Sequence, residues 1–170
     1  CFTTTGLIVV GGEVTTRAEV HYEAIARAVY HDIGYDDILT VSTRVAEQSP
    51  DIAQGVDTGG AGDQGIMYGY ATDETKEFLP KGVVLAHALA EGLHHLRREK
   101  KFPWLMPDGK TQVTLKDDTI LSVLVSTQHA QDVSQEEIRK ALTEKLIRPI
   151  VGEGTYEIFI NPTGAFVHGG

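Results

Sequence analysis

Cysteine and long apolar runs are nearly missing from this chain, and positive charge is scarce. The 170 residues include a single cysteine, Cys1, which excludes a disulfide scaffold and metal sites built from thiolates and suits an intracellular compartment. No apolar run is long enough to span a bilayer. The formal net charge is -9, whereas nucleic acids and anionic membranes favour partners with clustered Lys and Arg. We therefore expect a cytoplasmic protein that binds neither nucleic acid nor membrane.

Several common catalytic and metal-binding patterns are also missing. No Gly-Lys-[Ser/Thr] follows a glycine run, which excludes a P-loop, and no G-x-S-x-G elbow is present for a Ser-His-Asp hydrolase. His87, His94 and His95 lie on one predicted helix, but no carboxylate at ligand spacing completes a metal site. We interpret these histidines as part of a solvated helix face and predict no metal ligand.

The most informative stretch that is present is residues 60–65, which are Gly-Ala-Gly-Asp-Gln-Gly and match the dinucleotide pattern G-x-G-x-x-G. That pattern needs a strand before the glycines and a helix after them. Residues 66–72 alternate and are rich in aromatic side chains, which predicts a strand instead. We exclude a dinucleotide site and expect a backbone bend at which a ligand could approach the main chain near Asp63.

Strands and helices alternate along the rest of the chain and predict an α+β fold, with mixed sheets packed against helices. Apolar spacing predicts helices over residues 22–33, with Gly34 as the stop, over 83–96, and after the capping residue Ser134, with Ile138, Leu142 and Leu146 on one face. Polar or turn-rich composition predicts loops over 48–55 and 102–110. The remaining patterns predict strands over residues 7–10, 13–16, 38–46, 66–72, 111–115, 120–127 and 156–160. The strands 111–115 and 120–127 are expected to pair as a hairpin across the turn at 116–118.

Three positions have two interpretations each. Lys110 follows Asp-Gly at the mouth of a predicted strand, where it is either an ordinary turn lysine or an ammonium placed for phosphate oxygens. Glu13 is either a surface carboxylate at a strand edge or a binding residue. Phe166 follows an Asn-Pro-Thr-Gly turn and is either a core residue or a ring that stacks on a base.

Several segments, in this order and along the whole chain, resemble the S-adenosylmethionine synthetase family. They are residues 12–16, 48–57, 60–65, 67–72, 103–105, 107–114, 126–129 and 161–164. The resemblance implies the pseudo-threefold repeated-domain fold of that family. It also implies that residues 1–72, with a loop at 49–65, are the remainder of the N-terminal synthetase domain and that residues 73–170 are the central domain.

The activity implied by the resemblance is the synthesis of S-adenosylmethionine from methionine and ATP. The methionine sulfur attacks the ribose C5′ and displaces the triphosphate, which is then cleaved to phosphate and pyrophosphate. Such chemistry requires alignment of sulfur with carbon and positive charge on the leaving group.

The resemblance also implies roles for individual residues. Glu13, Gln54 and Asp63 correspond to methionine-binding positions, and Gln54 opens the family's mobile active-site loop. The ATP-binding positions are Asp63, Asp108, Gly109, Lys110, Ala165 and Phe166. Among these, Lys110 is expected to face the phosphates and Phe166 to stack on adenine. Ala165 replaces a residue that is commonly basic in the family, which weakens the case for one nucleotide contact.

Other parts of the family's catalytic machinery have no counterpart here. Its His-Pro-Asp-Lys motif is missing, its potassium-binding glutamate would precede Cys1, and its Gly-Leu-Thr-Gly-Arg-Lys region would follow Gly170. We therefore expect no catalytic and no metal-binding residue in this chain. In the complete enzyme we expect Mg²⁺ and K⁺ held by other residues, and a homodimer or a dimer of dimers.

Two hypotheses about the protein stay open. The first is a synthetase represented only in part by these residues. The second is a non-catalytic truncated relative that serves as a ligand-binding or interaction module. A native polypeptide much heavier than 18.5 kDa would favour the first hypothesis.

Overall fold

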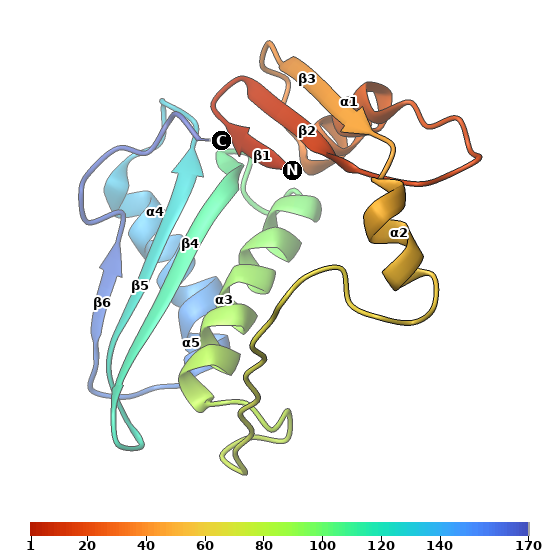
Figure 1. Ribbon diagram of the computed structural model, residues 1–170. Coiled ribbons are helices and arrows are strands. Elements are labelled where there is room, and N and C mark those ends of the chain that lie inside the picture. Colours follow the sequence, from red (N-terminus) through yellow and green to blue (C-terminus); the bar gives the residue numbers. More distant parts are fainter. Residues whose placement is uncertain (170) are drawn as a thin grey trace. The chain divides into compact units, whose positions relative to one another are not determined.

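The computed structural model describes residues 1–169 as two compact units, Cys1–Gly69 and Tyr70–Gly169 (Figure 1). Each unit combines helices with a three-stranded mixed sheet, which confirms the predicted α+β class. In this part of the chain, no helix is long and apolar enough to cross a membrane.

The sheet of the first unit has the order β1-β2-β3. A tight antiparallel pair is formed by β1 (Phe2–Thr4) and β2 (Leu7–Glu13), and β2 pairs in parallel with β3 (Thr40–Ala46). The predicted helix between the parallel strands is confirmed as α1 (Tyr22–Ile33). Gly34 ends this helix at a φ of 110°, a left-handed conformation that glycine adopts without strain.

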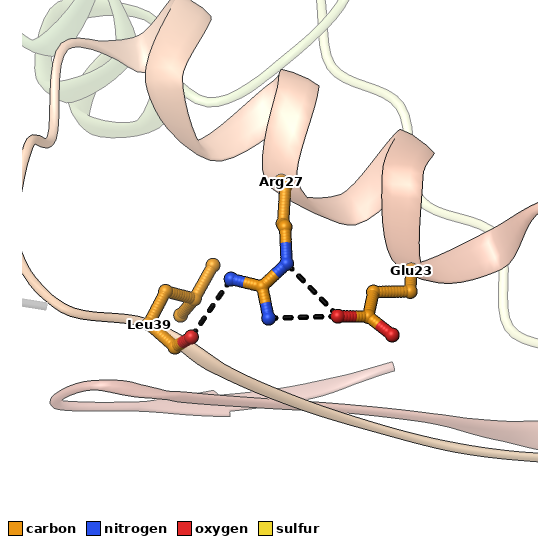
Figure 2. Close-up of polar contacts among 3 residues, drawn as sticks. All are labelled: Glu23, Arg27 and Leu39. Atoms are coloured by element: carbon orange, nitrogen blue, oxygen red, sulfur yellow. Dashed lines mark hydrogen bonds and ion pairs between the residues drawn. The ribbon is translucent and has the colours of Figure 1, made fainter.

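One arginine ties α1 to the chain that enters β3, as Figure 2 shows. The Arg27 guanidinium donates to Glu23 Oε1, one helical turn earlier, at 2.7 and 3.0 Å. Its remaining nitrogen, Nη1, donates to the carbonyl of Leu39 at 2.8 Å. The crossover helix is therefore tied by a polar contact to the residue that precedes β3.

The predicted loop over residues 48–55 is wrong, because α2 (Pro50–Val56) occupies most of it. The Ser49 hydroxyl accepts a hydrogen bond from the backbone N–H of Asp51, and Pro50 stands in the first turn, where its missing N–H costs nothing. Ser-Pro is a helix start in this setting and not a breaker.

The predicted strand over residues 66–72 is also wrong, since these residues form no regular element. The Ile66, Met67 and Tyr68 side chains are 81, 92 and 93% exposed. Alternation of side chains specifies a strand only when a neighbouring backbone is present to pair with it. The segment finds no such neighbour within the described residues.

The second unit places helices against a sheet of order β4-β5-β6 (Figure 1). Its strands are β4 (Leu105–Lys116), β5 (Thr119–His129) and β6 (Glu157–Ile160). Its helices are α3 (Lys81–Arg98), α4 (Gln135–Leu142), the π-helical turn η1 (Thr143–Ile147) and α5 (Arg148–Val151). The predicted hairpin between the first two strands is confirmed, while β5 and β6 pair in parallel.

The strand boundaries differ most from the predictions at two places. A separate extended segment was expected at residues 13–16, but β2 runs through Gly11 and Gly12 and ends at Glu13. A loop was expected over 102–110, but β4 already begins at Leu105. An irregular register between Leu105 and Gly109 accommodates the turn-forming residues inside the strand, as a bulge does.

The core of the second unit lies between its sheet and its helices. Val123 and Val125, on one face of β5, are fully buried, as is Leu89 of α3. The predicted face of the last helix is confirmed, because Ile138, Leu142 and Leu146 are all buried. The Ser134 hydroxyl caps that helix by accepting from the backbone N–H of Glu137.

Candidate functional site

The chain after β6 is fastened to β5 by a side chain that imitates a strand backbone. Asn161 Oδ1 accepts from the backbone N–H of Thr127 at 2.8 Å, and Asn161 Nδ2 donates to the carbonyl of Thr127 at 3.1 Å. Asn161 is buried and has a φ of 43°, a left-handed conformation that asparagine tolerates better than most residues. The β5-β6 pairing is thereby continued beyond the end of β6.

Gln128 links the same chain to β4. Its Oε1 accepts from the backbone N–H of Asp108 at 3.3 Å, and its Nε2 donates to the carbonyl of Val167 at 3.0 Å. Gly169 lies against Gln128 and Asp108, since a Cβ there would come within 2.7 Å of Gln128 Oε1 and 2.8 Å of the Asp108 Cβ. Only glycine fits this approach without displacing one of them.

Lys110 and Phe166 are brought together by this arrangement. Gly109 faces α3, because a Cβ there would lie 3.1 Å from the Leu93 Cδ1. Side chains alternate across a strand, so Lys110 points to the opposite face of the sheet. Its ammonium lies 4.9 Å from the centre of the Phe166 ring, within the range of a cation–π contact.

A groove of about 610 Å³ borders Phe166, and Lys110 is not among the residues that line it. Its lining comes from the segment after β6 and from the end of β5 to the start of α4: Ala165, Phe166, Val167, His168, His129, Gln131, Val133 and Gln135. The predicted ATP-binding residues of this unit thus lie on two neighbouring segments, one in β4 and one after β6.

The predicted methionine-binding residues belong to the first unit and are exposed. Glu13 ends β2, Gln54 Nε2 donates to the carbonyl of Asp51 from within α2, and Asp63 Oδ1 accepts from the backbone N–H of Gln64. No hydrogen bond or ion pair among the described residues joins Glu13, Gln54 and Asp63. Their role stays a prediction.

The glycine stretch at residues 60–65 closes the end of α2. The Gly60 N–H donates to the carbonyl of Gly55 at 3.1 Å, after Gly59 has turned the chain at a φ of 91°. A Cβ at Gly60 would come within 2.7 Å of that carbonyl oxygen, so the close approach requires glycine. A helix therefore precedes the glycines where a dinucleotide site needs a strand.

Sequence reasoning gave no individual role to four buried polar residues, Thr127, Gln128, His129 and Asn161. Each belongs to a segment that carries the family resemblance, but the pattern alone does not say what their side chains contact. The signal that could have found them is position, since Gln128 and His129 continue an apolar strand with groups that must be hydrogen-bonded when buried.

Metal binding is not accounted for by this site. Among residues 1–169, no cluster of three or more His, Cys, Asp or Glu side chains could hold a metal ion. The described residues therefore offer no such cluster for the Mg²⁺ that the resemblance implies.

Comparison with protein families places most of these contacts in one known domain. A family model described as S-adenosylmethionine synthetase, central domain, matches residues 58–166, which is more than half of the chain. The matched range contains Asp63, Asp108, Lys110 and Phe166, whereas Glu13 and Gln54 precede it.

Proposed function

Because the chain belongs to the S-adenosylmethionine synthetase family, we propose that it serves the synthesis of S-adenosylmethionine from methionine and ATP. The observation that carries this proposal is the contact between Lys110 and Phe166. A nucleotide offers a flat base and a chain of phosphate anions. An aromatic ring and a flexible ammonium 4.9 Å apart are the two groups suited to hold them.

Phe166 stacks on the base in this proposal, and Lys110 interacts with the triphosphate. When the methionine sulfur forms its bond to C5′, the C5′–O bond breaks and its electron pair leaves with the triphosphate. Negative charge on the leaving group therefore grows toward the transition state. An ammonium beside that group stabilises the transition state more than the bound substrate, which is the requirement for raising kcat.

Binding of the substrate methionine is assigned to Glu13, Gln54 and Asp63 from the family pattern alone. Further catalytic groups and the Mg²⁺ and K⁺ ligands are proposed to come from outside these residues.

A homodimer or a dimer of dimers belongs to the same proposal. Light scattering on the purified protein tests it, and a monomer at micromolar concentration would contradict it.

The enzymatic part of the proposal is tested by incubating the native protein with methionine, ATP, Mg²⁺ and K⁺. Chromatographic detection of S-adenosylmethionine is expected. If the product is absent while ATP still binds, the non-catalytic ligand-binding module becomes the better description.

The role of Lys110 is tested by Lys110→Ala. Loss of a charge-assisted contact is expected to weaken binding of ATP and of inorganic tripolyphosphate by about tenfold or more, with little change for methionine. Isothermal titration calorimetry measures all three. Lys116→Ala, near the tip of the same hairpin and exposed, is the matched control and is expected to change none of them. Equal losses for methionine and ATP would overturn the role.

A further inference from the structure

His129 holds the backbone of Phe166 at both of its polar groups. The His129 N–H donates to the carbonyl of Phe166 at 2.9 Å, and the Phe166 N–H donates to His129 Nε2 at 3.0 Å. His129 is only 2% exposed, so these contacts are largely shielded from water. A single residue therefore fixes the position of the backbone that carries the Phe166 ring.

The tautomer of His129 follows from its partners. Nδ1 lies 2.8 Å from the carbonyl of Ala130, which can only accept, so Nδ1 carries the proton. Nε2 is then the acceptor that the Phe166 N–H requires. Gln135 Nε2, at the start of α4, lies 3.3 Å from the same nitrogen and is a longer second donor that shares its single lone pair. These contacts together assign the neutral Nδ1–H form.

We propose that His129 is a positioning residue for nucleotide binding, which holds Phe166 so that its ring stays beside Lys110 and receives the base. This inference rests on the proposed function, because it takes the ligand to be a nucleotide. It assigns a role to a buried histidine that would touch neither the base nor the phosphates. If the Phe166 N–H loses its acceptor, the loop can shift and the stacking platform is lost while Lys110 stays in place on β4.

A comparison of two ligands separates this role from a general loss of structure. Calorimetric titrations of the full chain with ATP and with inorganic tripolyphosphate are compared for wild type, His129→Leu and His129→Gln. His129→Leu is expected to weaken ATP binding by about tenfold, the contribution of one base–aromatic stack, and to leave tripolyphosphate binding unchanged. His129→Gln is expected to restore ATP binding, because its Oε1 stands as many bonds from the backbone as Nε2 and can accept the same N–H.

A double variant tests whether His129 acts through Phe166. In the Phe166→Ala background, adding His129→Leu is expected to cause no further loss of ATP affinity, since the platform is already absent. A further loss in that background, or an equal loss for ATP and tripolyphosphate in the single variant, would overturn the positioning role.

A measurement on the wild-type protein keeps the proposal testable if His129→Leu does not fold. Nitrogen NMR of the His129 imidazole is expected to show the proton on Nδ1, and a proton on Nε2 would overturn the inference. The proposed function fails differently. If wild type binds tripolyphosphate but not ATP, or binds neither, the nucleotide site itself is wrong and this inference falls with it.

Discussion

At the scale of single residues, side-chain amides make the hydrogen bonds that a neighbouring strand backbone would otherwise make. Asn161 pairs with Thr127 through both of its polar atoms, and Gln128 bridges Asp108 and Val167 in the same manner. Backbone groups buried at the end of a sheet must be hydrogen-bonded, and a loop cannot continue the regular ladder. Side chains with one donor and one acceptor solve this problem locally, and they place the residues that follow.

Asn161 contributes through both its amide and its backbone conformation, and two substitutions separate these contributions. Asn161→Gly keeps the left-handed φ but removes the side-chain partners of the Thr127 backbone N–H and carbonyl. This loss is expected to lower the free energy of unfolding by about 2 kcal/mol. Asn161→Ala adds backbone strain and is expected to cost about 1 kcal/mol more. Urea denaturation measures both. If alanine is as stable as glycine there, the φ of 43° is not a constraint.

Tyr156 gives the second unit a dependence on alkaline pH. Burial raises the pKa of its phenol above the ordinary value of 10.0, the charge of Glu153 adds to the rise, and Arg148 opposes it. The folded state therefore holds the phenolic proton more tightly than the unfolded chain. The stability that results is present in full below pH 10.0 and is lost as the pH rises through the folded-state pKa.

Tyr156→Phe tests that dependence. The variant loses the hydrogen bond from the phenol to the carbonyl of Gly152 and is expected to be about 1 kcal/mol less stable at neutral pH. Above pH 10 its free energy of unfolding is expected to fall less steeply than that of wild type, as measured by urea titrations at several pH values. Parallel alkaline slopes would contradict the assignment to Tyr156. Tyr30, whose pKa burial and then Asp37 also raise, remains in both proteins.

At the scale of elements, the helix layer of the second unit depends on a close approach between α3 and η1. Leu146 and Ile147 are adjacent in sequence and both buried, which the wide π-helical turn allows. Leu146 then presses against α3 at Gly92, where a Cβ would stand 2.5 Å from the Leu146 Cδ1 and 3.1 Å from the Ile150 Cδ1. Glycine has a low helix propensity, but at position 92 its missing side chain leaves room for Leu146.

Gly92→Ala is expected to destabilise the protein despite improving helix propensity. The gain of about 1 kcal/mol from propensity is outweighed by overpacking of a core side chain, which costs about 1–3 kcal/mol. The control is Gly55→Ala in α2, where a Cβ would meet nothing within 4 Å and the substitution is expected to stabilise. Thermal unfolding of both variants measures the difference. A stabilised Gly92→Ala protein would show that Leu146 moves aside freely.

At the scale of the whole molecule, the two units differ in how much apolar surface they bury. The main core cluster is drawn entirely from the second unit. In the first unit only Ile8 and Leu39 are buried apolar residues, whereas Ile25 and Val29 on the apolar face of α1 remain 54 and 53% exposed. Since burial of apolar area is the main source of stability, the first unit has little of its own.

Separate expression of the two units tests this difference. Residues 70–170 alone are expected to unfold cooperatively on heating, with a transition in near-ultraviolet circular dichroism from the buried Trp104. Residues 1–69 alone are expected to show a weak or absent transition. A cooperative, equally stable fragment 1–69 would contradict this expectation.

The assignment of residues 1–72 to an N-terminal synthetase domain stays a prediction, because the family match begins at residue 58.

Helices α1, α3 and α4 and the β4-β5 hairpin were accessible from the amino-acid order because each depends on local information, whereas α2 was predicted as a loop. The apolar spacing in α1 and α3, the stop at Gly34 and the cap at Ser134 are all properties of neighbouring residues, and the structure confirms them. The expected strand over residues 66–72 failed because pairing needs a second backbone. That requirement is invisible in the segment itself.

The site was accessible only in part, for the same reason. Lys110 and Phe166 could be named as candidates one at a time, from the residues around each. Their contact depends on β6 pairing in parallel beside β5 and on Asn161, Gln128 and His129 fastening the chain beyond it. Those contacts join residues more than thirty positions apart, and it is folding of the sheet that brings an ammonium and an aromatic ring to one place.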